Sequence, residues 1–210
     1  MNRLLRIDTS TRGDASHSRR LGDEVEQALR EREPGLLIQR RNLADQPLPH
    51  LDLDTIGAFF TPDDALTEAQ RLATSLSDGV IEEVRRADAL LITTPMFNFG
   101  LPSGLKAWID QLVRVRRTFS YDGANFGGLL HGRIAIVAVA YGAGGFAPGG
   151  PMASGDFVAP YLEFVLRFVG FDEVHIVRAE GTNTATPSWP SIERLMERLT
   201  LPQHITEMPS

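Results

Sequence analysis

One stretch near the N-terminus decides the predicted fold, and it reads Leu4-Leu5-Arg6-Ile7-Asp8-Thr9-Ser10-Thr11-Arg12-Gly13-Asp14-Ala15-Ser16-His17-Ser18. The mainly apolar residues 4–9 predict a strand, which is followed by a polar turn that contains a glycine. Residues 16 to about 33 predict a helix, because their apolar side chains recur at helical spacing. The stretch is therefore typical of a strand, a turn and a helix in direct succession.

The same succession recurs along the chain. Strands are predicted at residues 4–9, from 36–38 onward, and at 89–94, 134–140 and 174–177. Helices are predicted at 16–33, at 67–86, from Pro102, at 157–169 and after Ser188, which is expected to cap the last helix. We expect residues 44–66, which contain prolines, to be irregular and residues 118–132 to form a long excursion.

Alternating strands and helices predict an α/β fold. The run 89–94 is apolar without alternation, as expected for a parallel strand that is covered on both faces. We therefore predict a doubly wound five-stranded parallel sheet with helices on both faces. Five strands suit the flavodoxin-like order 2-1-3-4-5 better than a six-stranded dinucleotide-binding order. The chain length fits a single domain that covers residues 1–210.

The composition argues against several classes of function. The 210 residues include no cysteine, which excludes disulfides, cysteine-based zinc sites and thiol catalysis. The five histidines lack metal-ligand spacing, so no metal site is expected. A net charge of −6 argues against a nucleic-acid partner. Neither a signal peptide nor a membrane span is visible, so no membrane partner and a cytoplasmic location are expected.

Ser10, Ser16, His17 and Ser18 lie where the first predicted strand passes into the first predicted helix. A helix N-terminus offers unpaired N–H groups and the positive end of the helix dipole, and serine hydroxyls add donors for a phosphate. Ser16 alone is also an ordinary helix cap. The segment matches neither the G-x-G-x-x-G pattern nor the P-loop, so a single phosphate ester is favoured over a dinucleotide.

Pro95, Met96, Phe97, Asn98 and Phe99 follow the third predicted strand, which neighbours the first in the predicted order. Ligands of open parallel sheets bind in the crevice at this point. The Asn98 amide can donate and accept hydrogen bonds, which suits the mixed polar edge of a flat ring, and its neighbours offer apolar surface. The alternative is that Phe97 and Phe99 belong to the hydrophobic core.

Gly142, Ala143, Gly144 and Gly145 follow the fourth predicted strand. Glycines let backbone amides approach a ligand closely, although this composition is equally typical of a flexible connection. A phosphate at one end and an aromatic ring at the other predict FMN as the cofactor, with these amides near the N1–C2=O edge of its ring. The chain has no G-x-S-x-G motif, and hydride transfer to a flavin needs no acid–base residue, so no catalytic side chain is predicted.

Several motifs, taken together, resemble those of one family. They are Ser10-Thr11-Arg12-Gly13-x-x-Ser16-x-Ser18, Pro47-Leu48-Pro49-His50-Leu51-Asp52, Pro95-Met96-Phe97-Asn98-Phe99-Gly100-Leu101-Pro102 and Leu105-Lys106-Ala107-Trp108-Ile109-Asp110. The chain is similar in them to the bacterial FMN-dependent NAD(P)H azoreductases, also called FMN-dependent NADH:quinone oxidoreductases. The resemblance implies phosphate contacts at Ser10 and at residues 16–18, and ring contacts at residues 96–99 and 142–145.

The resemblance also implies a homodimer with its active site at the subunit interface. The aromatic segment around Phe119, Tyr121 and Phe126 and the segment 47–62 are candidates for that interface. Two positions depart from the family pattern. Phe97 stands where the family often has tyrosine, and the loop that begins at Tyr141 replaces a frequent Ser-Arg-Gly-Gly.

The activity that follows from the resemblance is reduction of small aromatic acceptors. NADH or NADPH would act as co-substrate, and quinones or azo compounds would take the electrons in a ping-pong cycle. The alternative is a flavodoxin-like electron-transfer protein without a small-molecule substrate of its own. A regulatory module that binds a flavin or nucleotide without turnover is a third hypothesis.

Overall fold

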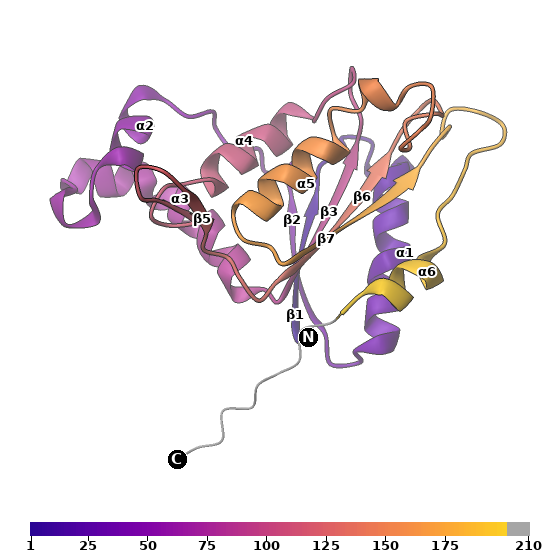
Figure 1. The fold of residues 1–210 in the computed structure, drawn as a ribbon, viewed down its shortest axis with the longest axis horizontal. Coiled ribbons are helices and arrows are strands. Elements are labelled where there is room, and N and C mark those ends of the chain that lie inside the picture. Colours follow the sequence, from indigo (N-terminus) through magenta and orange to yellow (C-terminus); the bar gives the residue numbers. More distant parts are fainter. Residues whose placement is uncertain (201–210) are drawn as a thin grey trace, which may run out of the picture.

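The structure, a computed structural model that describes residues 1–200, has a five-stranded parallel sheet at its centre (Figure 1). The strands are β1 (Arg3–Asp8), β2 (Leu37–Asn42), β3 (Ala89–Pro95), β6 (Ile134–Ala140) and β7 (Glu173–Ala179). Their order is β2-β1-β3-β6-β7, and all neighbouring pairs are parallel. Since β4 and β5 lie outside this sheet, the predicted order 2-1-3-4-5 is confirmed. Residues 201–210 of the predicted domain lie outside the described range.

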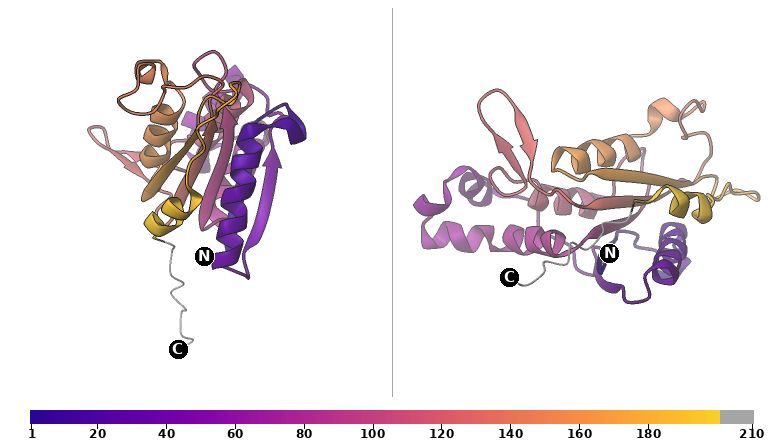
Figure 2. Two further views of the ribbon diagram at one scale, coloured as in Figure 1. Left: turned by 90° about the vertical axis from the view of Figure 1, so that its right-hand side faces the viewer. Right: turned by 60° about the horizontal axis from the view of Figure 1, so that its bottom comes forward.

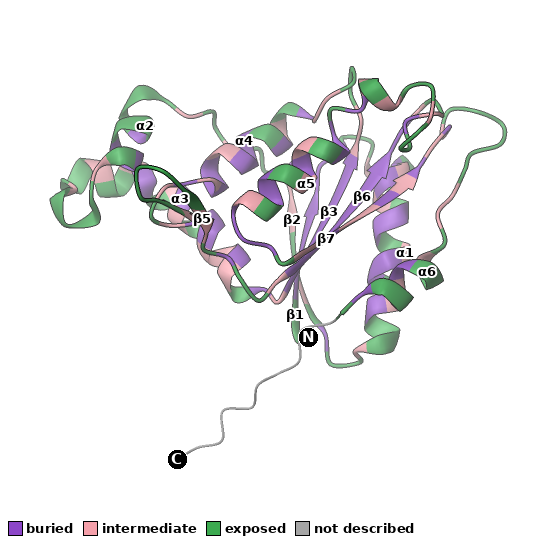
Figure 3. Ribbon diagram, in the orientation of Figure 1, coloured by how far each residue is buried: buried purple, intermediate pink, exposed green. Residues whose placement is uncertain are grey.

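Helices cover both faces of the sheet, as predicted (Figures 1 and 2). One face carries α1 (His17–Arg32) and α6 (Ile192–Arg198), and the other carries α3 (Glu68–Arg86), α4 (Ser103–Leu112) and α5 (Ala159–Phe168). Consecutive strand side chains alternate between the two layers, so that Leu4 packs in the layer of α1 and Leu5 in the opposite layer. Both faces of β3 and β6 are buried (Figure 3), which explains the apolar sequence of β6 and of the first four residues of β3. None of the described helices has the length and apolarity to span a membrane.

Residues 44–66 contain a helix that the sequence analysis did not predict, α2 (Leu53–Phe60). Asp52 caps its N-terminus, because the Asp52 Oδ1 accepts a hydrogen bond from the Thr55 N–H at 2.8 Å. The prolines of this segment precede or follow the helix and therefore do not interrupt it. The expectation of an irregular segment is thus wrong for α2, which packs against α3 (Figure 1).

The predicted excursion is an antiparallel hairpin that projects from the sheet (Figure 2), formed by β4 (Phe119–Tyr121) and β5 (Phe126–Gly128). Its base is fixed to the end of α5, because the N–H groups of Leu129 and Leu130 donate to the Val169 carbonyl at 3.0 and 2.9 Å. The two backbones meet so closely that a Cβ on Gly128 would overlap Gly170. Gly170 also has a φ of +110°, which favours glycine.

The last two helices begin later than predicted. Helix α5 begins at Ala159, two residues after its predicted start. The cap of α6 is Ser191 rather than Ser188, since the Ser191 Oγ accepts a hydrogen bond from the Arg194 N–H at 3.3 Å. Ser188 instead exchanges two backbone hydrogen bonds with Glu180, which follows β7. Serine is a good helix cap at either position, and the sequence alone did not discriminate between them.

Candidate functional site

Three loops meet at the carboxyl ends of β1, β3 and β6. Asp8, Thr93 and Ala138 lie side by side on the three strands, so the loops after these strands share one edge of the sheet. This edge is at the top of Figure 1. The structure therefore brings together the three segments from which the sequence predicted a cofactor site.

The serine segment forms a compact cluster of hydroxyl groups at the N-terminus of α1. Ser10, Ser16 and Ser18 are buried, and the Oγ atoms of Ser16 and Ser18 are 3.1 Å apart. Ser16 caps α1 by accepting a bond from the Arg19 N–H at 3.2 Å, and Ser10 Oγ accepts from the Arg12 N–H at 3.3 Å. One of the three hydroxyl protons is used between Ser16 and Ser18, so two remain to donate to a ligand. Ser16 is therefore both the cap of α1 and one of the predicted phosphate donors.

Arg19 links the two halves of this segment. Its Nη2 donates to the Ser10 carbonyl at 3.0 Å, and its Nε is buried without a hydrogen-bond partner in residues 1–200. His17 is the first residue of α1 and is half-buried. Hydroxyls, an unpartnered guanidinium N–H and the N-terminus of a 16-residue helix are together the donor set that a phosphate ester requires.

The segment after β3 is a tight turn. The N–H of Phe97 donates to the carbonyl of Gly100 at 3.0 Å, and the reverse bond measures 2.9 Å. The two residues between Phe97 and Gly100 are Asn98, with a φ of +49°, and Phe99, with a φ of +68°. Residues other than glycine and asparagine rarely adopt such positive φ values. Phe97 is 42% and Phe99 50% exposed, so the alternative that they belong to the core is wrong. Met96 is half-buried and packs on the core.

Hydrogen bonds to the segment after β7 hold the glycine loop in place. The carbonyls of Gly142 and Ala143 each accept a bond from that segment at 3.0 Å. The N–H of Gly145 donates to the Glu180 carboxylate at 2.8 Å. A Cβ on Gly142 would lie 2.7 Å from the Asn183 amide nitrogen, so a larger residue there would displace the Asn183 side chain. The predicted amide of Gly145 is therefore occupied within the chain, whereas Ala143 and Gly144 are exposed.

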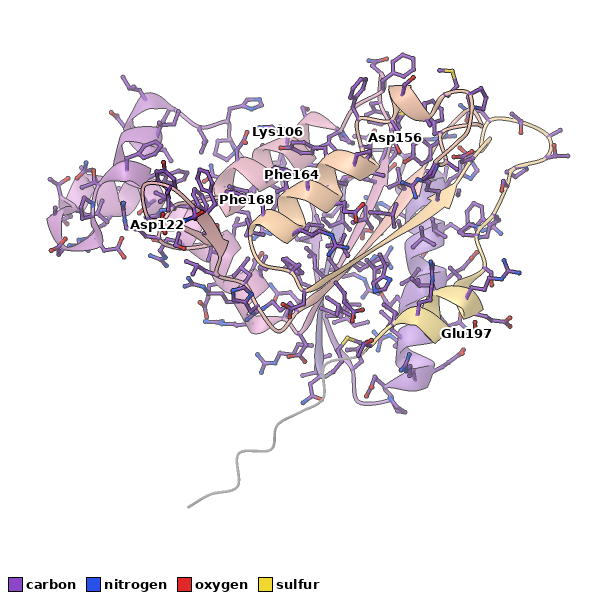
Figure 4. All side chains as sticks on the ribbon, in the orientation of Figure 1. Lys106, Asp122, Asp156, Phe164, Phe168 and Glu197 are labelled. Carbon is purple, nitrogen blue, oxygen red and sulfur yellow. The ribbon has the colours of Figure 1, made fainter. Side chains whose placement is uncertain are left out.

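A buried polar pair lies under this loop and was not predicted. Tyr141 Oη donates to Asp156 Oδ2 at 2.9 Å, and Asp156 Oδ1 accepts the N–H groups of Val158 and Ala159 at the start of α5. Figure 4 shows Asp156 next to the loops at this edge. Burial, with the charge of Asp156, raises the pKa of Tyr141 well above its usual value.

Sequence reasoning missed Glu180, Asn183 and Asp156 for one reason. Each meets the site through a contact between segments that lie far apart in the chain. The available signal was the short stretch of polar residues after the last strand, at the same sheet edge as the other loops.

A cavity of about 300 Å³ opens beside Phe97. It is lined by Thr9, Thr11, Leu43, Ala44, Pro47, Leu48, His50, Phe97, Pro102, Ser103, Gly104 and Ala107. The first part of the segment 47–62 thus lies beside the candidate site within a single chain. Largely apolar walls with a few hydroxyl groups and one imidazole suit a flat apolar ligand. Residues 1–200 hold no group of three or more His, Asp or Glu side chains arranged to bind a metal.

The sequence pattern of the family with a flavodoxin-like fold matches residues 2–200. The chain belongs to this flavodoxin-like family. Among its relatives is the FMN-dependent NADH:quinone oxidoreductase of Xanthobacter autotrophicus, 55% identical over 176 residues, which are 84% of this chain and 85% of that protein. FMN-dependent NAD(P)H:quinone oxidoreductase 1 of Pseudomonas aeruginosa is 39% identical over 194 residues, 90% of this chain and 92% of that protein.

Solved structures share the flavodoxin-like fold. An azoreductase from Bacillus anthracis superposes with a TM-score of 0.79 at 24% identity, over 87% of this chain and 88% of that one. An FMN-dependent NADH-azoreductase from Bacillus anthracis, in complex with FMN, has a TM-score of 0.78 at 26% identity, over 89% and 90% of the two chains. The predicted fold and the predicted family resemblance are both confirmed.

The residues of this flavodoxin-like chain fit FMN. The serine cluster offers donors to the phosphate, and the exposed turn at Phe97 and Phe99 offers flat apolar surface to the ring. Ala143 and Gly144 of the glycine loop are exposed, so their backbone amides are accessible to the polar edge of the flavin ring. The assignment of individual residues to the cofactor remains a prediction.

Proposed function

We propose that this chain is an FMN-dependent oxidoreductase that uses NADH or NADPH to reduce quinones and aromatic azo compounds. The observation that carries the proposal is the pairing of buried serine hydroxyls at the N-terminus of α1 with an exposed aromatic turn on the neighbouring strand β3. Relatives named for such activity, up to 55% identical, support it. FMN, when bound, would supply the electron chemistry, because it accepts a hydride from a nicotinamide and can reduce a second substrate.

The residues of the protein would bind FMN and orient its ring. Ser10, Ser16 and Ser18 would donate to the phosphate, with His17 and the first N–H groups of α1 beside them. Pro95, Met96, Phe97, Asn98 and Phe99 would line the ring from β3, and Gly142, Ala143, Gly144 and Gly145 would line it from β6. The open amides of the glycine loop would stabilise negative charge on the ring.

The substrates would use one slot in turn. Phe97 and Phe99 present their rings to solvent at the site, and the cavity of about 300 Å³ adjoins Phe97. A slot of this kind accepts one flat molecule at a time, so the oxidised nicotinamide leaves before the acceptor binds. That order of events is a ping-pong cycle. Water can supply the protons that a reduced quinone or azo compound takes up, so we assign no catalytic side chain.

A second copy of this chain would complete the site. The support is an exposed aromatic patch on the hairpin and α5. Tyr121 stacks on Phe126, and Phe126 contacts Phe168, which stacks on Phe164. Figure 4 shows Phe164 and Phe168 on α5. Tyr121, Phe126 and Phe164 are 52%, 60% and 68% exposed, which is unusual for large aromatic side chains. We propose that this patch is part of a homodimer interface and that the single domain acts in the cytoplasm.

Anaerobic reduction of the purified protein tests the proposed activity. The expected result is a yellow protein that NADH or NADPH bleaches and a quinone restores. A flavin that stays oxidised under an excess of both nicotinamides would contradict the enzyme and would favour an electron-transfer protein reduced by another protein. Sedimentation of the protein with Phe126→Ser and Phe164→Ser against the unchanged chain tests the dimer, which the double variant should weaken.

A further inference from the structure

Arg6 is a buried charge in the middle of β1 and makes a network that the proposed reaction does not use. Its side chain is 3% exposed. Nε donates to Asp8 at 3.0 Å, and Nη1 donates to Asp23 at 2.6 Å and to Glu26 at 3.0 Å. Nη2 donates to the backbone carbonyl of Arg19 at 3.3 Å. The single guanidinium therefore links its own strand to the first turns of α1.

This network leads directly into the serine cluster. Arg19, whose carbonyl Arg6 holds, donates its backbone N–H to Ser16 and its Nη2 to the Ser10 carbonyl. Asp8, which accepts from Arg6, also accepts from the Thr93 hydroxyl at 2.6 Å and so connects to β3. Arg6 therefore bonds α1 directly and is connected to Ser10 and Ser16 through Arg19.

Stability alone does not account for such a group. Removing charges from water is costly, and a buried ion pair is often no more stabilising than apolar residues of similar volume. Burial acts to lower the pKa of Arg6, but Asp8 and Asp23 outweigh it and raise the pKa, so the charge is retained. What the forked guanidinium provides, and an apolar side chain does not, is a fixed direction for several acceptors at once.

We infer that Arg6 is a positioning residue that sets the first turn of α1 against Ser10 and thereby shapes the phosphate-binding cluster for FMN. The inference rests on the proposed function, since the phosphate site is part of that proposal. Arg6 itself contacts neither the candidate ligand positions nor solvent. Its effect would reach the phosphate only through Arg19 and the three serines.

Binding of FMN and of riboflavin to the flavin-free protein tests the inference, because riboflavin lacks only the phosphate. The unchanged chain should bind FMN more tightly than riboflavin. Arg6→Lys keeps the charge but cannot reproduce the fork, and it should weaken FMN binding about tenfold to a hundredfold while riboflavin binding changes less than about twofold. Asp23→Ala removes one anchor at a side chain that is 66% exposed, so the fold should persist, and it should give a smaller loss of the same selectivity.

Arg114→Lys is the matched control. The Arg114 side chain is also almost fully buried, at 2% exposed, and donates to Asp78 at 2.8 Å, but it lies after α4 and away from the serine cluster. It should leave the ratio of FMN to riboflavin affinity unchanged. Equal losses for both flavins in Arg6→Lys, or unchanged FMN affinity in Arg6→Lys and Asp23→Ala, would overturn the inference. An unchanged chain that fails to prefer FMN would instead overturn the proposed phosphate site.

Discussion

Replacing Phe99 by glycine and, separately, by alanine divides the two roles of this residue. Phe99 has a φ of +68°, in the left-handed region, and its half-exposed ring lies 6.4 Å from the ring of Phe146. Both variants remove the ring, but only glycine removes the backbone strain. The difference in stability between the two variants therefore reports the backbone strain less the extra conformational entropy that glycine loses on folding.

The size of the effect follows from these two terms. A left-handed backbone costs a residue with a Cβ about 1–2 kcal/mol, and glycine loses about 0.5–1 kcal/mol to the greater freedom of the unfolded chain. The glycine variant should therefore be more stable than the alanine variant by about 0.5–1 kcal/mol, or roughly 1–4 °C in Tm. Loss of a half-buried ring should cost both variants about 1 kcal/mol.

Urea unfolding of the flavin-free protein measures the stabilities, and fluorescence quenching measures FMN affinity. Both variants should bind FMN more weakly than the unchanged chain, because each lacks the aromatic surface beside the ring. Asn98→Gly is a control. Asparagine tolerates a φ of +49°, so this variant should gain little stability. An alanine variant at least as stable as the glycine variant would refute the strain argument.

Three further predictions concern the serine cluster, Tyr141 and two helix glycines. Replacing Ser16 and Ser18 together by alanine should weaken FMN binding more than riboflavin binding, whereas equal losses would contradict a phosphate contact. Because burial raises the pKa of Tyr141, the unfolded chain ionises first, and stability should fall as pH rises above about 10. Tyr141→Phe should lessen that fall in stability, and equal falls in the unchanged chain and in the variant would contradict this prediction. Gly22→Ala should lower the free energy of unfolding by about 1–3 kcal/mol, because the new Cβ would overlap Thr93 of β3. Gly79→Ala has open space around the new Cβ and should raise the free energy of unfolding by up to about 1 kcal/mol. Urea unfolding measures both.

The sheet could be predicted because strands that are buried on both faces consist mainly of consecutive apolar residues. β6 is an unbroken apolar run and β3 begins with one, the alternation with helices indicated a parallel sheet, and the number of strands indicated their order. The helix α2 was missed because it has only eight residues and lies among prolines that suggest a loop. The hairpin strands have three residues each, too few for any period to be visible.

The candidate site was predictable where it depends on single loops and not where it depends on contacts between them. Phe97 and Phe99 are of a residue type that is common in cores, but in the structure they belong to a tight turn and are 42% and 50% exposed. Glu180 reaches the glycine loop because β6 and β7 are neighbours, which no local pattern records. Arg6 was visible in the sequence as a charge within an apolar strand, but its four acceptors were not.

The contact between Gly128 and Gly170 restricts how this protein can change by descent. A Cβ on either glycine would overlap the backbone opposite it, so a side chain at either position would disturb the base of the hairpin. We therefore expect both positions to stay glycine although they lie far apart in the chain. The tip of the hairpin, at residues 122–125, has no such partner in the described chain and is exposed. Variation between lineages should accumulate at the tip, and length changes there should leave the anchored base in place.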